Sequence, residues 1–266
     1  MLFGDRLVVL RGGGDLASGA AYQLHRAGFP IVILELPEPL AIRRPVTFAS
    51  AVHEGEITID GVPGRRAESG LEALTVARDG AVAVMISPRI ADFGEPISVL
   101  VDARLAKRNI DTEINQAPLV IALGPGFTAG VDCDAVVETM RGHRLGRVTW
   151  HGAAAPNTGI PGSVGGASAE RVLRAPIAGP VEWSVDIGDA VSEAQQLGTV
   201  GDQPVRTTIG GVVRGLITPG FQAPAGLKIA DVDPRADRSA CFEISDKARL
   251  VGSGVLEAAL TWLNRQ

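Results

Sequence analysis

Leu7-Val-Val-Leu-Arg-Gly-Gly-Gly-Asp-Leu-Ala17 is the stretch that decides the predicted fold. Its first four residues form an apolar run typical of a buried parallel strand, and three glycines end that run abruptly. Asp15 is a good helix N-cap, and apolar residues return at helical spacing after it. A second apolar run, 31–34, ends in Glu35. The order strand, glycine loop, helix, strand and acid predicts a Rossmann-like unit.

The chain continues with the same alternation of elements. Apolar runs predict strands at 81–86, 98–101 and 119–123, and helical spacing predicts helices at 71–78 and 135–140. The alternating segment 56–62 predicts an inserted hairpin. We therefore expect residues 1–165 to form an α/β domain whose parallel sheet is covered on both faces.

Proline and glycine crowd the chain after Gly152, which predicts a domain boundary there. Beyond it, residues 177–200 align with residues 209–232 at an offset of 32. Two copies of short strands with glycine turns predict a small all-β domain at 170–235, a barrel-sandwich of the biotinyl/lipoyl kind. The segment between the copies lacks a lysine, which argues against a carrier role. Residues 236–266 form a C-terminal segment with an amphipathic helix at 254–263.

Composition narrows the class of partner. The 266 residues carry a net charge of −5 and only 4% aromatic side chains, which argues against nucleic acid or a membrane surface as a partner. The apolar runs are far shorter than the roughly 20 residues that span a bilayer. We expect a cytoplasmic protein that binds a small anionic ligand and that could form a homo-oligomer.

The first glycine loop is the leading candidate for that ligand. It satisfies the pattern G-x-G-x-x-[GA] between a strand and a helix, and its candidate cofactor-binding residues are Gly12, Gly14, Asp15, Ala17 and Glu35. The glycines would let the backbone approach a phosphate, and Glu35 would accept a hydrogen bond from a ribose hydroxyl. We expect Gly14 to adopt a positive φ or to contact the ligand. Asp15 departs from the pattern because its carboxylate would repel a phosphate. A tight structural turn is the alternative.

Further candidates lie in a second glycine loop and in three basic motifs. The loop follows the strand at 119–123 and so shares the carboxyl edge of the sheet. The candidate anion-binding residues here are Gly124, Gly126, Thr128, Gly130, Arg43, Arg44, Lys107, Arg108, Asn109, Arg141 and Arg144. His143 is the candidate catalytic residue, since it can change charge near neutral pH. An ordinary turn, a solvated basic face and a hydrogen-bonded structural histidine are the alternatives. We predict no metal site.

Eight segments in order resemble a known family. They are 11–17, 35–44, 107–109, 124–130, 138–143, 157–159, 228–235 and 245–248. The chain is similar, nearly end to end, to the YqeB-type accessory proteins of selenium-dependent molybdenum hydroxylases. The resemblance implies a role in maturation or cofactor handling, a molybdopterin dinucleotide or another nucleotide as ligand, and a molybdenum hydroxylase as partner. It assigns no catalytic residue.

Two other hypotheses remain open. The same glycine motif with Glu35 is compatible with an NAD(P)-dependent oxidoreductase, although no acid/base set for a substrate accompanies it. The repeat at 170–235 could instead be an interaction module that docks on the hydroxylase without a small ligand.

Overall fold

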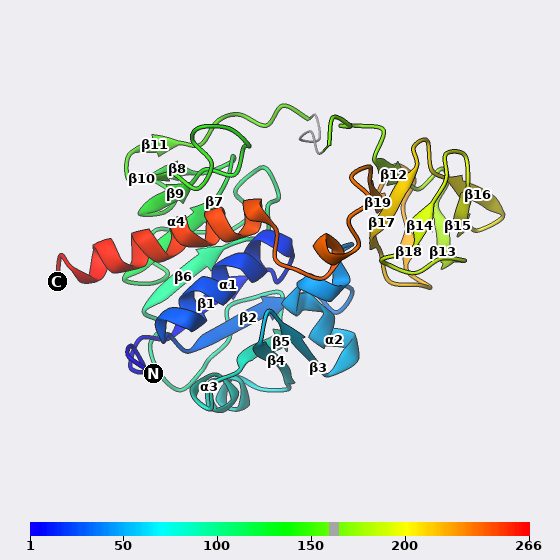
Figure 1. Cartoon of the computed structure of the whole chain (residues 1–266). Helices are drawn as coiled ribbons and strands as arrows, with labels where there is room; N and C mark the ends of the chain where they lie inside the picture. Colours follow the sequence, from blue (N-terminus) through cyan, green and yellow to red (C-terminus); the bar gives the residue numbers. More distant parts are fainter. Residues whose placement is uncertain (160–164) are drawn as a thin grey trace. The chain divides into compact units, whose positions relative to one another are not determined.

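The computed structural model describes residues 1–159 and 165–266, which form two compact units (Figure 1). Unit 1 consists of Met1–Pro39, Thr47–Asn157 and Ile244–Gln266. Unit 2 consists of Leu40–Val46 and Thr158–Glu243. Each unit therefore combines stretches that lie far apart in the sequence.

Unit 1 is built on a nine-stranded sheet with the order β10-β9-β7-β6-β1-β2-β5-β4-β3. The strands are β1 (Val8–Arg11), β2 (Ile31–Glu35), β3 (Glu56–Ile59), β4 (Val62–Ala67), β5 (Val82–Ile86), β6 (Val99–Asp102), β7 (Leu119–Leu123), β9 (Ala135–Val137) and β10 (Val148–Thr149). Neighbouring strands are parallel except at the two edges, where β3 and β10 are antiparallel to β4 and β9. A separate short pair joins β8 (Thr128–Ala129) to β11 (Gly152–Ala153).

Helices cover the sheet unevenly. They are α1 (Asp15–Ala27), α2 (Ala51–Glu54), α3 (Gly70–Arg78) and α4 (Asp246–Leu263), with short 3₁₀ turns η1 (Arg44–Val46), η2 (Phe48–Ser50) and η3 (Ser239–Cys241). Figure 1 shows α1 and α4 side by side over one face. Val8 and Leu10 face these helices, whereas Val9 packs in the core that contains α3. A Cβ at Gly19 would lie 2.2 Å from the Ala248 carbonyl oxygen, so the helices can touch only because glycine is there.

The predicted Rossmann-like fold is wrong. The sheet is mixed, β5 lies between β2 and β4, and loops connect β5 to β6 and β6 to β7. The helix over β7, β9 and β10 is α4, which comes from the C-terminal end of the chain. The sequence motif correctly places one strand–helix–strand unit, but the pattern is local and carries no information about which segment covers the rest of the sheet.

The predicted helix at 135–140 is also wrong, because residues 135–137 form the buried strand β9 beside β7. Three residues with two adjacent valines fit a strand that is buried on both faces better than a helix. The expected hairpin is β3–β4, whose two turn residues, Asp60 and Gly61, both have positive φ.

Unit 2 contains two four-stranded antiparallel sheets with the orders β12-β19-β17-β14 and β16-β15-β13-β18. The strands are β12 (Val172–Arg174), β13 (Gly179–Trp183), β14 (Ala190–Val191), β15 (Gln196–Val200), β16 (Gln203–Arg206), β17 (Gly211–Leu216), β18 (Gln222–Ala223) and β19 (Lys228–Asp233). Their apolar side chains share one core.

The predicted barrel-sandwich of the biotinyl/lipoyl kind is wrong. The strands do recur at the 32-residue offset, as β13, β14 and β15 followed by β17, β18 and β19. However, strands of both copies are mixed within each of two small sheets, which β12 and β16 complete at their edges. A repeat in sequence fixes the spacing of strands and turns, whereas pairing decides how the sheets are assembled.

Within the described part of the chain, each helix is either too short or too polar to cross a lipid bilayer.

Candidate functional site

Five loops of unit 1 meet at the carboxyl edge of its parallel strands. They follow β1, β2, β6, β7 and β9 and begin at Gly12, Leu36, Ala103, Gly124 and Glu138. Ligands of open α/β sheets bind outside the carboxyl ends of the strands. The structure thus brings the two predicted glycine loops and the Lys107 motif to one edge.

The first glycine loop is held by groups of the protein itself. Gly12 has φ 92°, and a Cβ there would lie 3.2 Å from Arg104 Cα. The Gly13 N–H donates to Glu35 Oε2 at 2.6 Å. The Gly13 carbonyl accepts from Ser18 Oγ and from the Ala49 N–H, both at 3.1 Å. These contacts fix the loop before any ligand is bound.

Gly14 does not have the positive φ that was the first of two expectations for it, whereas the second, contact with a ligand, stays a prediction. Its φ is −68° and its ψ −171°, and a Cβ there would meet nothing within 4 Å. Gly14 is the N-cap of α1 and supplies no side-chain cap, so the first turn of the helix begins next to open space. The carboxylate of Asp15 lies in that turn and makes it less positive, whereas Ala17 is buried in the core.

The Glu35 carboxylate binds the backbone of the first glycine loop at the Gly13 N–H. It is buried, and its second oxygen, Oε1, accepts from the Leu36 N–H at 2.7 Å. Burial raises the pKa of Glu35, and the contacts with the Leu36 and Gly13 N–H groups oppose that rise. Each carboxylate oxygen of Glu35 thus already accepts a backbone N–H, Oε2 from Gly13 in the glycine loop and Oε1 from Leu36 after β2.

The second glycine loop is packed against neighbouring backbone. Gly124 has φ 75°, and a Cβ there would lie 2.5 Å from Thr139 Oγ1. Gly126 has φ 108°, and a Cβ there would lie 2.6 Å from both the nitrogen and the Cα of Arg108. The Gly126 carbonyl accepts from the Asn109 N–H at 3.0 Å. This loop is filled by the chain rather than open to a ligand.

The remaining loop residues have structural contacts as well. The Thr128 N–H donates to Asp132 Oδ2 at 2.7 Å, and the Gly130 N–H donates to the Cys133 carbonyl at 2.8 Å. The Asn109 side-chain amide donates to Asp132 Oδ1 at 3.1 Å. These contacts position Lys107 and Arg108 of the same motif, which are exposed and make no ion pair within residues 1–159 and 165–266.

A charged cluster beside the first glycine loop was missed by sequence reasoning. Arg11 and Asp102 end β1 and β6 and are almost fully buried. Arg104 contacts Asp102 Oδ2 at 2.6 Å. Asp111 accepts from Arg11 Nη2 at 2.8 Å and from Arg104 Nη1 at 2.7 Å. Thr112 donates to Asp102 Oδ2 at 2.6 Å. The charged residues that end the apolar runs of β1 and β6 were the signal that could have indicated this cluster.

Arg43 and Arg44 lie in unit 2, where they bind the chain's own backbone. Arg43 Nη2 donates to the Ala240 and Glu243 carbonyls, both at 3.0 Å, and Arg44 Nε donates to the Leu216 carbonyl at 2.9 Å. These arginines attach the segment Leu40–Val46 to unit 2.

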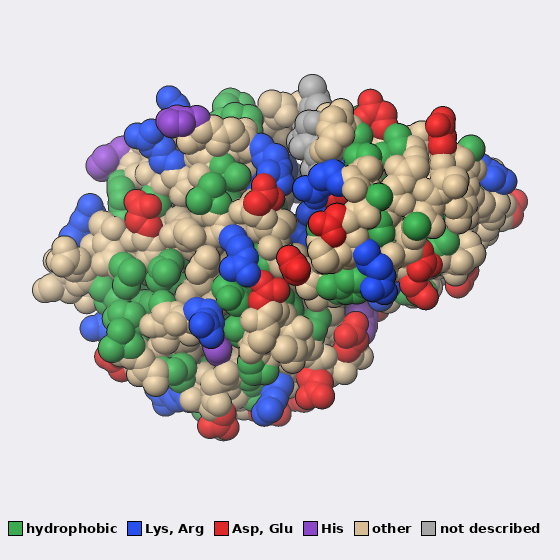
Figure 2. Space-filling model, viewed as in Figure 1, with side chains coloured by type: hydrophobic (Ala, Val, Ile, Leu, Met, Phe, Trp, Pro, Cys, Tyr) green, Lys and Arg blue, Asp and Glu red, His purple; other side chains and the backbone are tan. Residues whose placement is uncertain are grey.

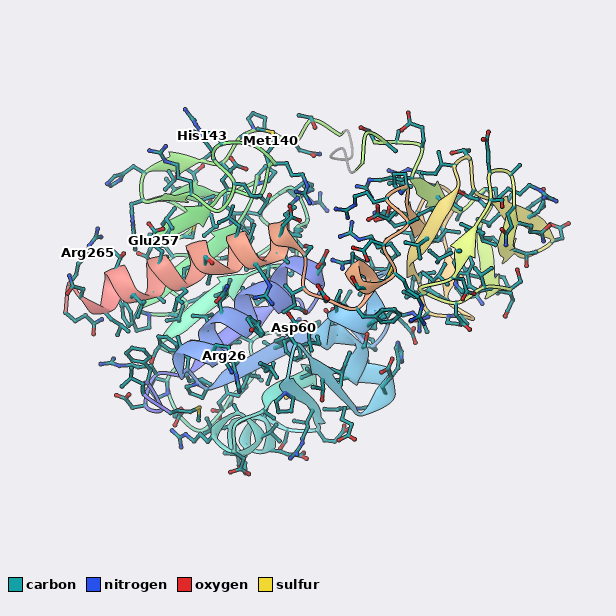
Figure 3. All side chains as sticks on the ribbon, viewed as in Figure 1. Arg26, Asp60, Met140, His143, Glu257 and Arg265 are labelled. Atoms are coloured by element: carbon teal, nitrogen blue, oxygen red, sulfur yellow. The ribbon has the colours of Figure 1, made fainter. Side chains whose placement is uncertain are left out.

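The third basic motif lies in the loop between β9 and β10. Arg141 forms two hydrogen bonds to the Asp246 carboxylate, at 2.7 and 2.9 Å, and thereby ties this loop to the start of α4. His143 and Arg144 are exposed, and Figure 3 shows His143 at the surface of unit 1. No nucleophile or acid accompanies His143 among the contacts that the described residues make.

Acidic and basic side chains are interspersed over the visible face of unit 1 (Figure 2). A depression of about 580 Å³ lies elsewhere in this unit, next to residues 95–97 and 115–118. These segments precede β6 and β7, so the depression lies at the amino ends of the strands, opposite the glycine loops.

Comparison with known proteins identifies one close curated relative. No family model matches the chain. The chain is 46% identical over 264 residues to the uncharacterized protein YqeB of Escherichia coli (strain K12), which covers 98% of this chain and 49% of that protein. The chain thus spans about half the length of the curated relative that it matches.

Solved structures give much weaker likenesses. An aspartoacylase family protein from Mesorhizobium loti is 11% identical over 86% of this chain and 85% of its own, with a TM-score of 0.26. The product-bound ectoine utilization protein EutE (DoeB) from Ruegeria pomeroyi is 13% identical over 85% of this chain and 56% of its own, with a TM-score of 0.23. At such scores the likenesses have no bearing on fold or activity.

Proposed function

The chain belongs to the YqeB family, and we propose that it binds an anionic cofactor of the nucleotide or molybdopterin type at the carboxyl edge of unit 1 during maturation of selenium-dependent molybdenum hydroxylases. The observation that carries the binding proposal is the start of α1 at Gly14, which supplies no side-chain cap and lies next to open space. The N–H groups of a helix start, together with the helix dipole, favour an anion.

Exposed cations at the same edge support the proposal. Lys107 and Arg108 follow β6, and Gly126 holds the backbone of Arg108 in place by close packing. A phosphate bound by these side chains would gain charge-assisted hydrogen bonds. Because Asp15 disfavours an anion in the first helical turn, we assign the main electrostatic attraction to the residues after β6.

The proposed role in maturation rests on the family resemblance and not on the geometry of the binding site. The proposed partner is a molybdenum hydroxylase, and the proposed compartment is the cytoplasm. We do not propose an NAD(P)-dependent oxidoreductase, because Glu35, which favoured that hypothesis, is buried and already binds the Gly13 and Leu36 N–H groups, and no acid/base set for a substrate accompanies the glycine motif.

Calorimetry on the full chain tests the binding proposal. The ligands are cytosine and adenine nucleotides, NAD(P) and isolated molybdenum cofactor. We expect one of the nucleotide or molybdopterin ligands to bind, and the double substitution Lys107→Gln with Arg108→Gln to weaken it by about tenfold. Absence of binding by all of these ligands would refute the proposal.

A matched control removes two exposed charges elsewhere on unit 1, by Arg26→Gln with Arg65→Gln. Arg26 lies near the opposite end of α1 from Gly14 (Figure 3). This control should leave affinity within about twofold, since distant exposed charges are screened by salt. An equal loss in both double variants would show that only net charge matters and would contradict a site after β6.

A further inference from the structure

We propose that Arg11 and Arg104 form a phosphoryl-binding site and that the Asp111 carboxylate occupies it as an exchangeable internal ligand. The inference rests on the proposed function and deepens it, because it names the group of the cofactor that is bound and the residues that bind it. Neither arginine was a candidate from the sequence.

The charges of the cluster are balanced by two different carboxylates. Asp102 is buried and pairs with Arg104, and it also accepts from Thr112 Oγ1. Among the described residues, Arg11 has only Asp111 as an ion-pair partner, with Thr112 Oγ1 a further neutral acceptor at 3.3 Å. Since a buried arginine is strongly destabilised without an anion, the position of Asp111 must be filled by a negative charge.

Asp111 differs from Asp102 in its exposure. Half of its side chain, 51%, is accessible, whereas Arg11 beneath it is 4% accessible. Asp111 lies in the long loop between β6 and β7, so its departure would not disturb a strand. Hydrogen bonds from Arg11, and then from Arg104, hold the pKa of Asp111 below its usual range despite some burial, so it is an anion at neutral pH.

The geometry of the contact suits a phosphoryl group. The two arginines each donate to a different oxygen of Asp111, Arg11 to Oδ2 and Arg104 to Oδ1. A phosphoryl group also presents two or more oxygens on one atom, and it carries more charge than a carboxylate. It can therefore replace Asp111 with the same pair of charge-assisted hydrogen bonds.

The arginine pair is adjacent to the first glycine loop. Arg11 directly precedes Gly12, and the backbone of Arg104 is the neighbour that a Cβ at Gly12 would meet. A ligand bound here would lie at the same carboxyl edge as the start of α1. The carboxylate of Asp15 makes the helix start less positive, and the two arginines would supply positive charge beside it.

Titration of the full chain with inorganic pyrophosphate tests the inference. Asp111→Asn keeps the size of the side chain and removes its charge, and we expect it to bind pyrophosphate about tenfold more tightly than the wild type. Glu113→Gln removes an equal charge from the same loop at an exposed residue, and we expect it to leave affinity within about twofold. Equal affinities in the two variants would overturn the inference.

Thermal unfolding gives a second readout if Asp111→Asn destabilises the protein. Without added anion we expect its Tm to fall, since Arg11 loses its partner, and pyrophosphate should raise it by more than it raises the Tm of Glu113→Gln. A lowered Tm that pyrophosphate does not restore would mean that Asp111 is only a structural clamp. Adding Arg104→Gln to Asp111→Asn should abolish the gain in affinity.

The outcomes separate this inference from the proposed function. Tighter pyrophosphate binding by Asp111→Asn without any nucleotide or molybdenum-cofactor binding would retain the anion site and refute the cofactor. Cofactor binding that is indifferent to Asp111→Asn would retain the proposed function and refute the arginine site.

Discussion

The two glycine loops at the carboxyl edge of unit 1 both follow a buried strand, but Gly14 of the first and Gly124 and Gly126 of the second have different surroundings. In the first, Gly14 has an ordinary φ and faces open space. In the second, Gly124 and Gly126 have positive φ and would clash with Thr139 and Arg108 if they carried a Cβ. The difference teaches that a glycine-rich sequence after a strand does not distinguish a ligand loop from a packing device. The surroundings of each glycine do.

The largest effect is expected for Gly126→Ala. The new Cβ would combine an unfavourable φ with contacts of 2.6 Å to the Arg108 backbone, which cannot move like the end of a side chain. We expect the free energy of unfolding of unit 1 to fall by about 2–5 kcal/mol, as measured by urea denaturation. Gly80→Ala is the matched control: its φ is 93° but its surroundings are open, so it should cost only about 1–2 kcal/mol. Equal losses would contradict the packing argument.

A smaller loss is expected for Gly124→Ala, because the obstacle there is a side chain. The Cβ would lie 2.5 Å from Thr139 Oγ1, and we expect a loss of about 2–3 kcal/mol in the same experiment. Combining Gly124→Ala with Thr139→Ala should cost about 1 kcal/mol less than the sum of the two single losses. Strict additivity would show that the φ alone accounts for the effect.

Local elements could be predicted from the sequence because their signals are local. The buried strand before Gly12, the helix Asp15–Ala27, and the hairpin with Asp60 and Gly61 follow from apolar runs, spacing and turn residues, although the N-cap of the helix is Gly14 and not the expected Asp15. The way in which these elements pack together could not be predicted from the sequence. The helix α4 packs on α1, and β5 inserts between β2 and β4, and both depend on contacts between distant segments. That is where the Rossmann-like prediction failed.

The candidate site could be predicted only in part for the same reason. The sequence indicated which loops end at the carboxyl edge, and Lys107 and Arg108 are exposed there. Spacing could not show that Glu35 holds the Gly13 N–H, or that Arg43 binds carbonyls in unit 2. Arg11 and Asp111 are 100 residues apart in the sequence, and only the parallel arrangement of β1 and β6 brings their loops together.

The dependence of stability on pH tests how firmly the first loop is held by Glu35. Its pKa in the folded state is raised, chiefly by burial, so folding favours its protonated form. The titration of Glu35 therefore contributes most to the unfolding free energy at low pH. This contribution is lost as pH rises from the pKa of the unfolded state, near 4.5, through the pKa of the folded state. Glu35→Gln lacks this titration. Its deficit in unfolding free energy relative to the wild type should narrow as pH rises above 4.5, as measured by urea denaturation. A deficit that widens with pH would mean that the two N–H contacts outweigh burial.

The smallest effect on stability is expected for Gly14→Val, which separates the two loops most directly. Because φ at Gly14 is −68° and a Cβ there would have no neighbouring atom within 4 Å, a branched side chain causes no backbone strain. Valine is less favourable than glycine at an N-cap, so the unfolding free energy should fall, but by no more than about 1 kcal/mol. The valine would, however, occupy the open space before the first N–H groups of α1, where we propose that the cofactor phosphate approaches. Affinity for the ligand found by calorimetry should fall by about tenfold or more while the protein stays folded. If Gly14→Val kept full affinity, the first loop would be a turn like the second, and binding would have to depend on the residues after β6 alone.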